Sequence, residues 1–220
     1  MRKLTGAVFV SLDGVMQAPG GPEEDPSGGF RFGGWVAPFW DENMGPFEKL
    51  IMSEYDLLLA KRTYDIFSAY WPYNQDDPIG AKFQRINKYV VTHSDEPLSW
   101  DNSEKLSGDL GEAVAELKNS EGRDLLIQGS STLYVPLLAA GLIDRLVLIT
   151  FPVLLGKGKR ILDGSQQPGA FKLKDSFVTP TGVVIASYEP NGDVPTSTFE
   201  TKEPSKAELE RREKWAREDA

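Results

Sequence analysis

The chain has 220 residues, 40% of them hydrophobic and 26% charged, a balance typical of one soluble globular domain with a substantial core. Lys and Arg total 24 and Asp and Glu total 33, so the net charge is −9. This charge argues against a general nucleic-acid binder, which needs surplus positive charge. The absence of cysteine excludes disulfides, thiolate catalysis and cysteine-based zinc sites.

The first residues, MRKLTGAVFVSLDG, hold only a short apolar run and lack the cleavage site of a signal peptide. No apolar run in the chain approaches the roughly 20 residues that span a bilayer. We therefore expect a cytoplasmic protein that does not bind membranes.

Strand and helix patterns alternate along the first half of the chain. LTGAVFVS (residues 4–11) predicts a buried strand, and a loop rich in Gly, Pro and acidic residues follows it. Loops of that length in compact domains are often functional lids. The next expected elements are a helix over 41–55, a strand over 56–60, a helix over 61–71, a helical segment over 79–87 and a strand over 88–94.

The second half continues the alternation and ends in a hairpin. The expected elements are a helix over 110–120, a strand over 124–128, a helix over 131–141, a strand over 145–155, and two alternating strands, 171–179 and 182–189, joined at Pro180-Thr181-Gly182. Strands that alternate with helices indicate a mainly parallel sheet covered on both faces, and the hairpin makes the sheet mixed.

The composition changes after Pro190, so we expect one domain over residues 1–190 and a separate segment over 191–220. The segment consists of a linker and a charged helix, with Ser205 and Glu208 spaced as a capping box. Either this helix is solvated, or it is an arm that docks Trp215 on a partner subunit.

One strand is followed by Gly129-Ser130-Ser131 and then by a helix. The start of a helix carries a partial positive charge and unpaired backbone N–H groups, so such a turn can bind phosphate without a basic side chain. A nucleophile elbow, G-x-S-x-G, is one alternative, but Leu133 replaces its last Gly and the lone His93 precedes the serine. A capped turn without a ligand is the other.

Two further strand ends carry polar groups. Lys61-Arg62-Thr63 follows one strand, and Thr92-His93-Ser94 ends another. Ligands of open α/β sheets bind at the carboxyl ends of the strands, so one long ligand with two separated phosphate groups, such as NADP, would use all three segments. The Rossmann fingerprint and the P-loop motif are both missing, which predicts a non-Rossmann mode of binding.

As a set, five segments of the chain resemble the dihydrofolate reductase-like superfamily, and more closely the reductase domain of the bifunctional riboflavin-pathway deaminase-reductases. They are FVSLDGVM (9–16), LLLAKRTYDIF (57–67), KYVVTHS (88–94), LLIQGSSTLYVPLLAAGLIDRL (125–146) and FPVLLGKGKRI (151–161). The resemblance covers roughly residues 3–190. It implies an α/β fold with a mixed, mainly parallel sheet of about eight strands, NADPH as hydride donor, and a homodimer.

The resemblance also implies which residues form the site. Lys61, Arg62 and Thr63 match the segment that holds the adenosine phosphates, and Thr92 and His93 match the pair beside the 2′-phosphate. Phe9 and Met16 flank the start of the mobile loop near the nicotinamide. The pyrophosphate is expected against Gly129, Ser130, Ser131, Thr132 and Leu133, and the substrate against Trp35 and Phe47. The chain departs from the family at Ala60 and Ser130, where members often have Gly.

Asp41 is the candidate catalytic residue. Folate-reducing enzymes carry a pocket carboxylate on the helix after the loop, and Asp41 or Glu42 falls near that place. The alternative role of Asp41 is to cap the N-terminus of that helix. The H-x-E and cysteine motifs of zinc deaminases are absent, so no deaminase domain and no metal are expected.

The sequence thus predicts an NADPH-dependent oxidoreductase that acts on a small heterocycle, similar to 5-amino-6-(5-phosphoribosylamino)uracil reductase. A dihydrofolate or pteridine reductase and a non-catalytic nucleotide-binding protein remain alternatives. The loop over 13–34, with Phe30 and Phe32, would close over the site together with Trp35 and exclude water.

Overall fold

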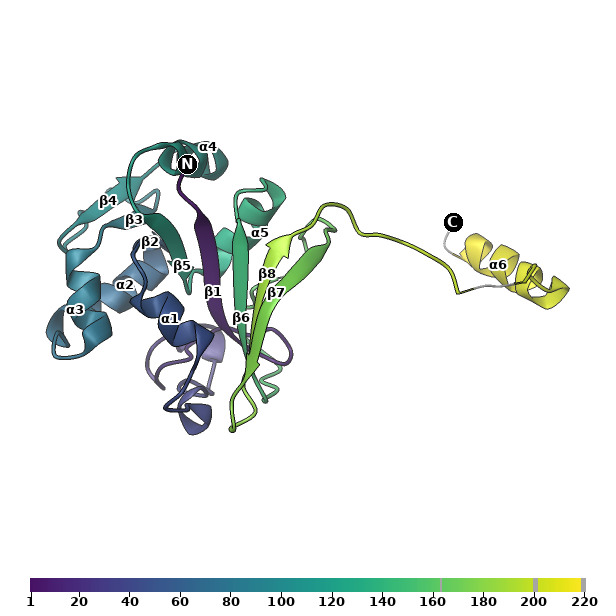
Figure 1. Ribbon diagram of the computed structural model, residues 1–220, viewed down its shortest axis with the longest axis horizontal. Coiled ribbons are helices and arrows are strands. Elements are labelled where there is room, and N and C mark those ends of the chain that lie inside the picture. The colour runs from purple at the N-terminus through teal and green to yellow at the C-terminus, as the bar shows by residue number, and fades with distance from the viewer. Residues whose placement is uncertain (163, 200–201, 219–220) are drawn as a thin grey trace.

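The computed structural model describes residues 1–162, 164–199 and 202–218. Its body is built on one eight-stranded sheet with the strand order β4-β3-β2-β5-β1-β6-β8-β7 (Figure 1). The strands are β1 (Leu4–Ser11), β2 (Tyr55–Ala60), β3 (Lys88–Val91), β4 (Ser103–Leu106), β5 (Asp124–Gln128), β6 (Arg145–Phe151), β7 (Phe171–Val178) and β8 (Val184–Pro190).

The strand pairing is mixed and mainly parallel, as the sequence predicts. Neighbouring strands from β4 to β6 pair in parallel, whereas β8 runs antiparallel to both β6 and β7. The β7–β8 hairpin closes where the N–H of Gly182 donates to the carbonyl of Thr179 at 3.0 Å. This turn confirms the predicted hairpin at Pro180-Thr181-Gly182.

Helices cover both faces of the sheet, which also confirms the expectation. One core contains Phe47 and Tyr64 from α1 and α2, and the core on the other face contains Val114 and Leu137 from α4 and α5. The helices are α1 (Pro46–Met52), α2 (Lys61–Tyr70), α3 (Pro78–Arg85), α4 (Leu110–Asn119), α5 (Ser131–Ala139) and α6 (Lys206–Glu218). Single 3-10 turns occur at η1 (Ser27–Gly29), η2 (Ala37–Phe39) and η3 (Trp71–Tyr73).

The predicted helix over 41–55 is wrong at both ends, since α1 spans only Pro46–Met52. The Oδ1 of Asp41 accepts the N–H of Asn43 at 2.9 Å, and the Oδ1 of Asn43 accepts the N–H of Gly45 at 3.0 Å. Two successive side-chain turns of this kind compete with helix formation. Asp41 therefore lies in a loop before the helix and does not cap it.

The structure also contains one strand that the sequence did not predict, and two predicted strands end early. The sequence gives no signal for β4, because three of its four residues, SEKL, are polar and none is buried at the sheet edge. The predicted strand over 88–94 ends at Val91, and the one over 145–155 ends at Phe151. Beyond Phe151 the chain turns toward Asp13, whose carboxylate accepts the N–H groups of Leu155 and Gly156.

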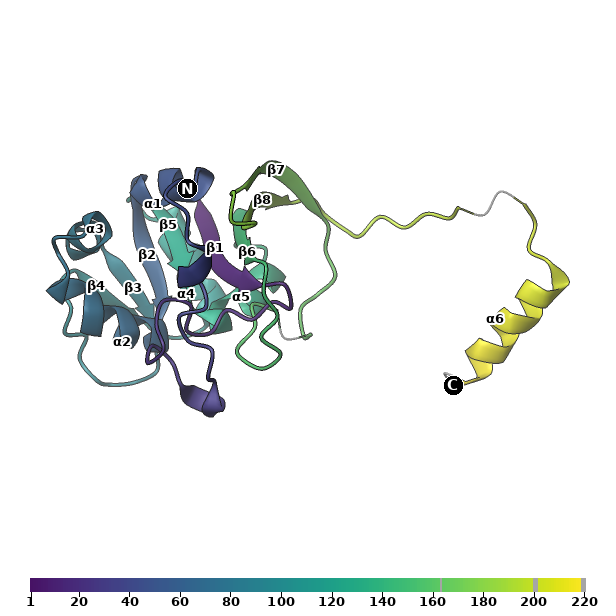
Figure 2. The same cartoon turned by 90° about the horizontal axis from the view of Figure 1, so that it is seen from below.

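The C-terminal segment leaves the body after β8, and α6 stands apart from it (Figures 1 and 2). None of the residues of α6 is buried. Among the helices in the described part of the chain, none is both long enough and apolar enough to cross a membrane.

Candidate functional site

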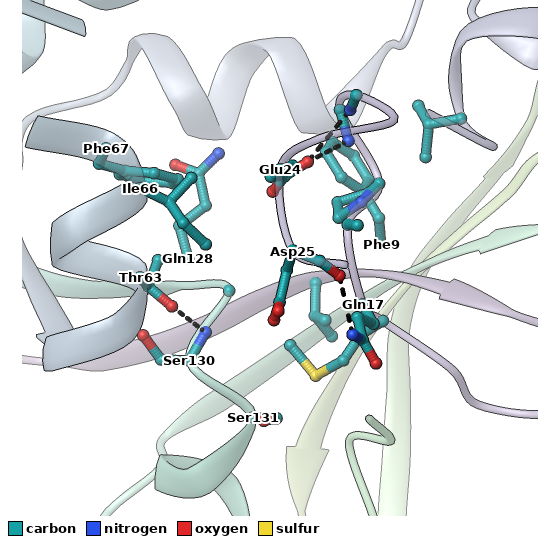
Figure 3. A pocket seen from close by; sticks show the side chains of 18 of the residues that line it. Phe9, Gln17, Glu24, Asp25, Thr63, Ile66, Phe67, Gln128, Ser130 and Ser131 are labelled. Carbon is teal, nitrogen blue, oxygen red and sulfur yellow. Dashed lines mark hydrogen bonds between the residues drawn. The ribbon is translucent and has the colours of Figure 1, made fainter. Parts of the chain in front are cut away.

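A cleft of about 1060 Å³ opens at the carboxyl ends of the central parallel strands (Figure 3). Its walls come from β1, the loop that follows β1, α1, α2 and the turn between β5 and α5. Because parallel strands end at one edge of the sheet, segments far apart in the sequence converge there.

The turn between β5 and α5 has an unusual backbone. Gly129 and Ser130 both lie in the left-handed region, with φ of +69° and +61°. This conformation is costly for Ser130, at roughly 1–2 kcal/mol, whereas a glycine adopts it freely. Two hydrogen bonds hold Ser130 in place: its N–H donates to Oγ1 of Thr63 at 2.9 Å, and its Oγ accepts the N–H of Ala60 at 3.0 Å.

The left-handed turn aims the start of α5 at the cleft. Ser131 and Thr132 form the first turn of α5 and line the cleft. Their backbone N–H groups donate to no acceptor in residues 1–162, 164–199 or 202–218. Unpaired N–H groups and the helix dipole together make this end of α5 suited to an anion.

Two cations line the cleft, and one buried carboxylate contacts both. Lys159 forms an ion pair with Asp25, and Nη1 of Arg62 lies 3.4 Å from Oδ1 of Asp25. Burial would raise the pKa of Asp25, but hydrogen bonds from Lys159 and Ser27 and the charge of Lys159 outweigh burial, so the pKa falls below its usual value. Two cations against one carboxylate leave this part of the cleft with one net positive charge.

The loop after β1 is folded against the cleft by Gln17. The Nε2 of Gln17 donates to the carbonyls of Asp25 and Ser27, both at 2.9 Å, and its Oε1 accepts the N–H of Lys159 at 3.0 Å. The carbonyl of Gln17 accepts the indole N–H of Trp35 at 2.8 Å. Trp35 thus fixes the base of the loop, where it is buried against Phe151.

The rest of the cleft is walled by aromatic and aliphatic side chains. Phe9 packs on Phe47 with ring centroids 5.1 Å apart, and Trp40 packs edge-on against both rings. Ile66, Phe67 and other apolar residues of α2 and η3 supply another wall. Such a compartment suits a flat apolar ring.

Two polar side chains project into this apolar compartment (Figure 3). The Oε2 of Glu24 accepts the N–H groups of Gly20 at 2.6 Å and Gly21 at 3.2 Å. Burial raises the pKa of Glu24, these two N–H groups lower it and Asp25 raises it, so the net pKa lies above its ordinary value. The buried Oε1 of Gln128 accepts no hydrogen bond in the described part of the chain.

The structure brings most of the predicted cofactor residues into the cleft wall. Those that line it are Phe9, Met16, Arg62, Thr63, Gly129, Ser130, Ser131 and Thr132, and the predicted substrate residue Phe47 lines it as well.

The remaining predicted residues lie outside the cleft wall. Lys61 pairs with Asp65 at 2.7 Å and with Glu96 at 3.2 Å. The others outside the wall are the buried Thr92, the exposed His93, the core residue Leu133, Trp35 and the loop residue Asp41.

Sequence reasoning missed Glu24, Asp25, Gln128 and Lys159. The acids of GGPEED stand out as a cluster in a Gly- and Pro-rich loop, a signal that could have marked Glu24 and Asp25. Nothing in the sequence pairs Asp25 with Lys159. Within the ranges that the structure describes, no group of three or more His, Asp or Glu residues could hold a metal ion.

The solved structures that share this fold include the following three. A protein from Shewanella sp. PV-4 whose name provisionally assigns it to riboflavin biosynthesis has a TM-score of 0.65 and 20% identity, covering 86% of this chain and 99% of its own. Dihydrofolate reductase from Enterococcus faecalis, complexed with NADP(H) and RAB-propyl, has a TM-score of 0.55 and 16% identity, covering 86% and 96%.

The third structure is a diaminohydroxyphosphoribosylaminopyrimidine deaminase/5-amino-6-(5-phosphoribosylamino)uracil reductase from Thermotoga maritima. Its TM-score is 0.57 at 14% identity, covering 86% of this chain and 57% of its own. These likenesses show the dihydrofolate reductase-like fold. At the level of sequence, residues 2–185 match the model of the RibD C-terminal domain. The chain therefore belongs to the RibD C-terminal domain family.

Proposed function

We propose that the protein is an NADPH-dependent reductase that transfers hydride to a small heterocycle, a reaction of the type catalysed by 5-amino-6-(5-phosphoribosylamino)uracil reductase. The observation that carries the proposal is the continuity of the cleft. An anion-binding helix start with two nearby cations adjoins an aromatic compartment in one space. Family membership supports it, as does a dihydrofolate reductase of the same fold that is complexed with NADP(H).

The residues at the polar end fit a dinucleotide. The free N–H groups of Ser131 and Thr132 would hold the pyrophosphate, and Arg62 and Lys159 would add charge-assisted contacts to phosphate oxygens. A bound NADPH would supply the hydride. The chain would place nicotinamide and substrate side by side in the apolar compartment, which supplies proximity and excludes water.

The experiment that tests the proposal is the substitution Ser131→Asp. The new carboxylate would face the phosphates and should lower NADPH affinity tenfold or more, on the order of 1.4 kcal/mol. At a helix N-terminus the same charge should be neutral for stability or should stabilise the fold by roughly 0.3–1 kcal/mol. A fluorescence titration and a thermal melt measure the two effects separately.

Ser205→Asp is the matched control. Ser205 precedes α6, its Oγ accepts the N–H of Glu208 at 3.3 Å, and an aspartate can replace it as a cap. It adds the same charge at a helix start outside the cleft and should leave NADPH affinity unchanged. Unchanged affinity in a folded Ser131→Asp protein would refute the cofactor placement, and NADPH binding without turnover of any heterocycle would favour the non-catalytic alternative.

A homodimer is the proposed assembly, and the support is the edge strand β7. Phe171 and Leu173 on this strand are 41% and 51% exposed, and exposed apolar edge strands tend to pair with another chain. Light scattering should give twice the chain mass, and Leu173→Lys should shift the population toward monomer. A monomer at all concentrations would exclude this assembly.

A further inference from the structure

We propose that the substrate of this cleft is a flat, N–H-bearing heterocycle that is neutral or cationic and carries no phosphate or carboxylate group. The inference rests on the proposed function, because it assigns the polar end of the cleft to the cofactor. It concerns the other end, where the lining residues combine aromatic walls, two acidic side chains and an unpartnered amide oxygen.

The positions of the cations that line the cleft are the first reason to expect a substrate without a phosphate. Arg62 and Lys159 are the cations among the described residues that line the cleft. Both contact Asp25, and Arg62 precedes Thr63, whose Oγ1 accepts the N–H of Ser130 in the turn between β5 and α5. Phe67 and Trp71 follow Arg62 by five and nine positions, which places them roughly 7–14 Å further along the helix axis. A phosphate that lies beside Phe67 and Trp71 would therefore be well separated from Arg62.

The acidic residues in the loop after β1 are the second reason to expect a substrate without an anionic group. Glu23 and Glu24 both line the cleft, and neither forms an ion pair with any group in the part of the chain that the structure describes. Their charge would repel an anionic substrate, and the partial burial of Glu24 strengthens its share of that repulsion, whereas solvent screens the exposed Glu23. The raised pKa of Glu24, which burial causes, agrees with an environment that disfavours added negative charge.

The hydrogen-bond acceptors in the cleft indicate that the substrate bears N–H groups. The Oε1 of Gln128 is buried without a partner, and a buried polar atom of this kind is normally satisfied. Only Oε2 of Glu24 accepts backbone N–H groups, so Oε1 can accept another donor. Figure 3 shows the two side chains projecting into the same space. The unpaired Oε1 of Glu24, and Oε1 of Gln128 once its amide turns toward the cleft, would together select a ligand that offers ring or amino N–H groups.

The apolar walls determine the shape of the ligand. Phe9, Trp40 and Phe47 form an edge-to-face cluster, with Phe9 and Trp40 centroids 6.1 Å apart. Aromatic walls favour a planar ring over a flexible polar chain. The charge, hydrogen-bonding and shape constraints thus agree on a planar nitrogen heterocycle without an anionic group.

Two probes that differ by one phosphate test this inference. They are 5-amino-6-(5-phosphoribosylamino)uracil and its dephosphorylated form. Calorimetry should measure binding of each probe to the full chain, without cofactor and with saturating NADP⁺. We expect the dephosphorylated probe to bind as tightly as the phosphorylated probe or more tightly, with the difference largest at low ionic strength. Tenfold tighter binding of the phosphorylated probe would overturn the inference, as would failure of both probes to bind.

Two variants make the test specific to the named residues. Gln128→Leu should weaken binding of the dephosphorylated probe about tenfold and leave NADPH affinity unchanged, whereas Gln167→Leu on an exposed loop should change neither. Glu24→Gln should reduce any discrimination against the phosphorylated probe at least threefold, and Glu121→Gln, exposed and outside the cleft, should not. An unaltered probe affinity in folded Gln128→Leu would overturn the assignment.

The outcomes separate the two proposals. If NADPH does not bind, the proposed function fails, and the cofactor-free titrations still report on the heterocycle. If NADPH binds and the phosphorylated probe is strongly preferred, the proposed function stands and the substrate class is wrong.

Discussion

Asp25 and Lys159 form an ion pair in the cleft wall although 134 residues separate them in the sequence. The carboxylate of Asp25 is only 8% exposed, and it also contacts Arg62. This contact joins the loop after β1 to the segment after β6. Both sides of the cleft therefore depend on one buried carboxylate.

Lys159→Met should lower the free energy of unfolding by about 1–3 kcal/mol, because it leaves Asp25 buried without its main partner. The double variant Asp25→Asn/Lys159→Met should regain part of that loss, since no buried charge is then unpaired. Denaturant unfolding of both proteins and of Asp25→Asn completes the cycle. Lys157→Met removes an exposed cation two residues away and serves as control. Strictly additive losses would show that the two side chains are not coupled.

The lowered pKa of Asp13, in the loop after β1 that also contains Asp25, predicts that the stability of the fold depends on pH. Hydrogen bonds from Ser11 first, then from the N–H groups of Leu155 and Gly156, outweigh burial and lower the pKa of Asp13 from 3.8 to about 2. Because the folded pKa is lower than the unfolded pKa, Asp13 stabilises the fold fully above pH 4. That contribution, no more than about 2 kcal/mol, is lost as the pH falls through 2.

Thermal melts between pH 2 and 5 check this prediction. Asp13→Asn should be less stable than the parent at pH 5, and the gap should close toward pH 2. Asp76→Asn removes an exposed carboxylate outside the cleft and should follow the parent at every pH. A gap between Asp13→Asn and the parent that stays constant with pH would contradict the assignment.

Arg62 should determine the preference for NADPH over NADH. Arg62→Gln should lower NADPH affinity tenfold or more, since a charge-assisted hydrogen bond contributes roughly 1.5–3 kcal/mol. NADH, which lacks the extra phosphate, should lose much less. Lys61→Gln should have the smaller effect, because Lys61 already pairs with Asp65 and Glu96 outside the cleft wall. Equal losses for both cofactors in parallel titrations would place the 2′-phosphate elsewhere.

The C-terminal segment should be dispensable for the fold. Deleting residues 203–220 removes α6, none of whose residues is buried. The melting temperature and the NADPH affinity should both stay the same, as calorimetry and titration would show. A fall in either value, or a change of mass in light scattering, would favour an arm that docks Trp215 on a partner subunit.

Local sequence patterns were sufficient to predict the layers of this fold. Apolar runs such as DLLLA and DLLIQ predicted the buried strands, because a parallel strand covered on both faces must be apolar along its length. The same reasoning failed for β4, whose residues SEKL pair at the edge of the sheet and carry no such pattern. It also failed around Asp41, where side-chain turns replaced the first part of the predicted helix.

The residues of the candidate site also fall into those that the sequence predicts and those that only the tertiary structure places. The sequence by itself determined the strand–turn–helix segments that face the cleft, including Gly129 to Thr132 and Thr63, because strand order and turn chemistry are local properties. Only the tertiary structure decided that Arg62 faces the cleft while Lys61 faces Asp65, and that Lys159 meets Asp25. Helix phase and loop path decide these contacts. Both depend on packing between segments that are apart in the sequence, by 37 residues for Arg62 and Asp25 and by 134 for Asp25 and Lys159, which no local pattern encodes.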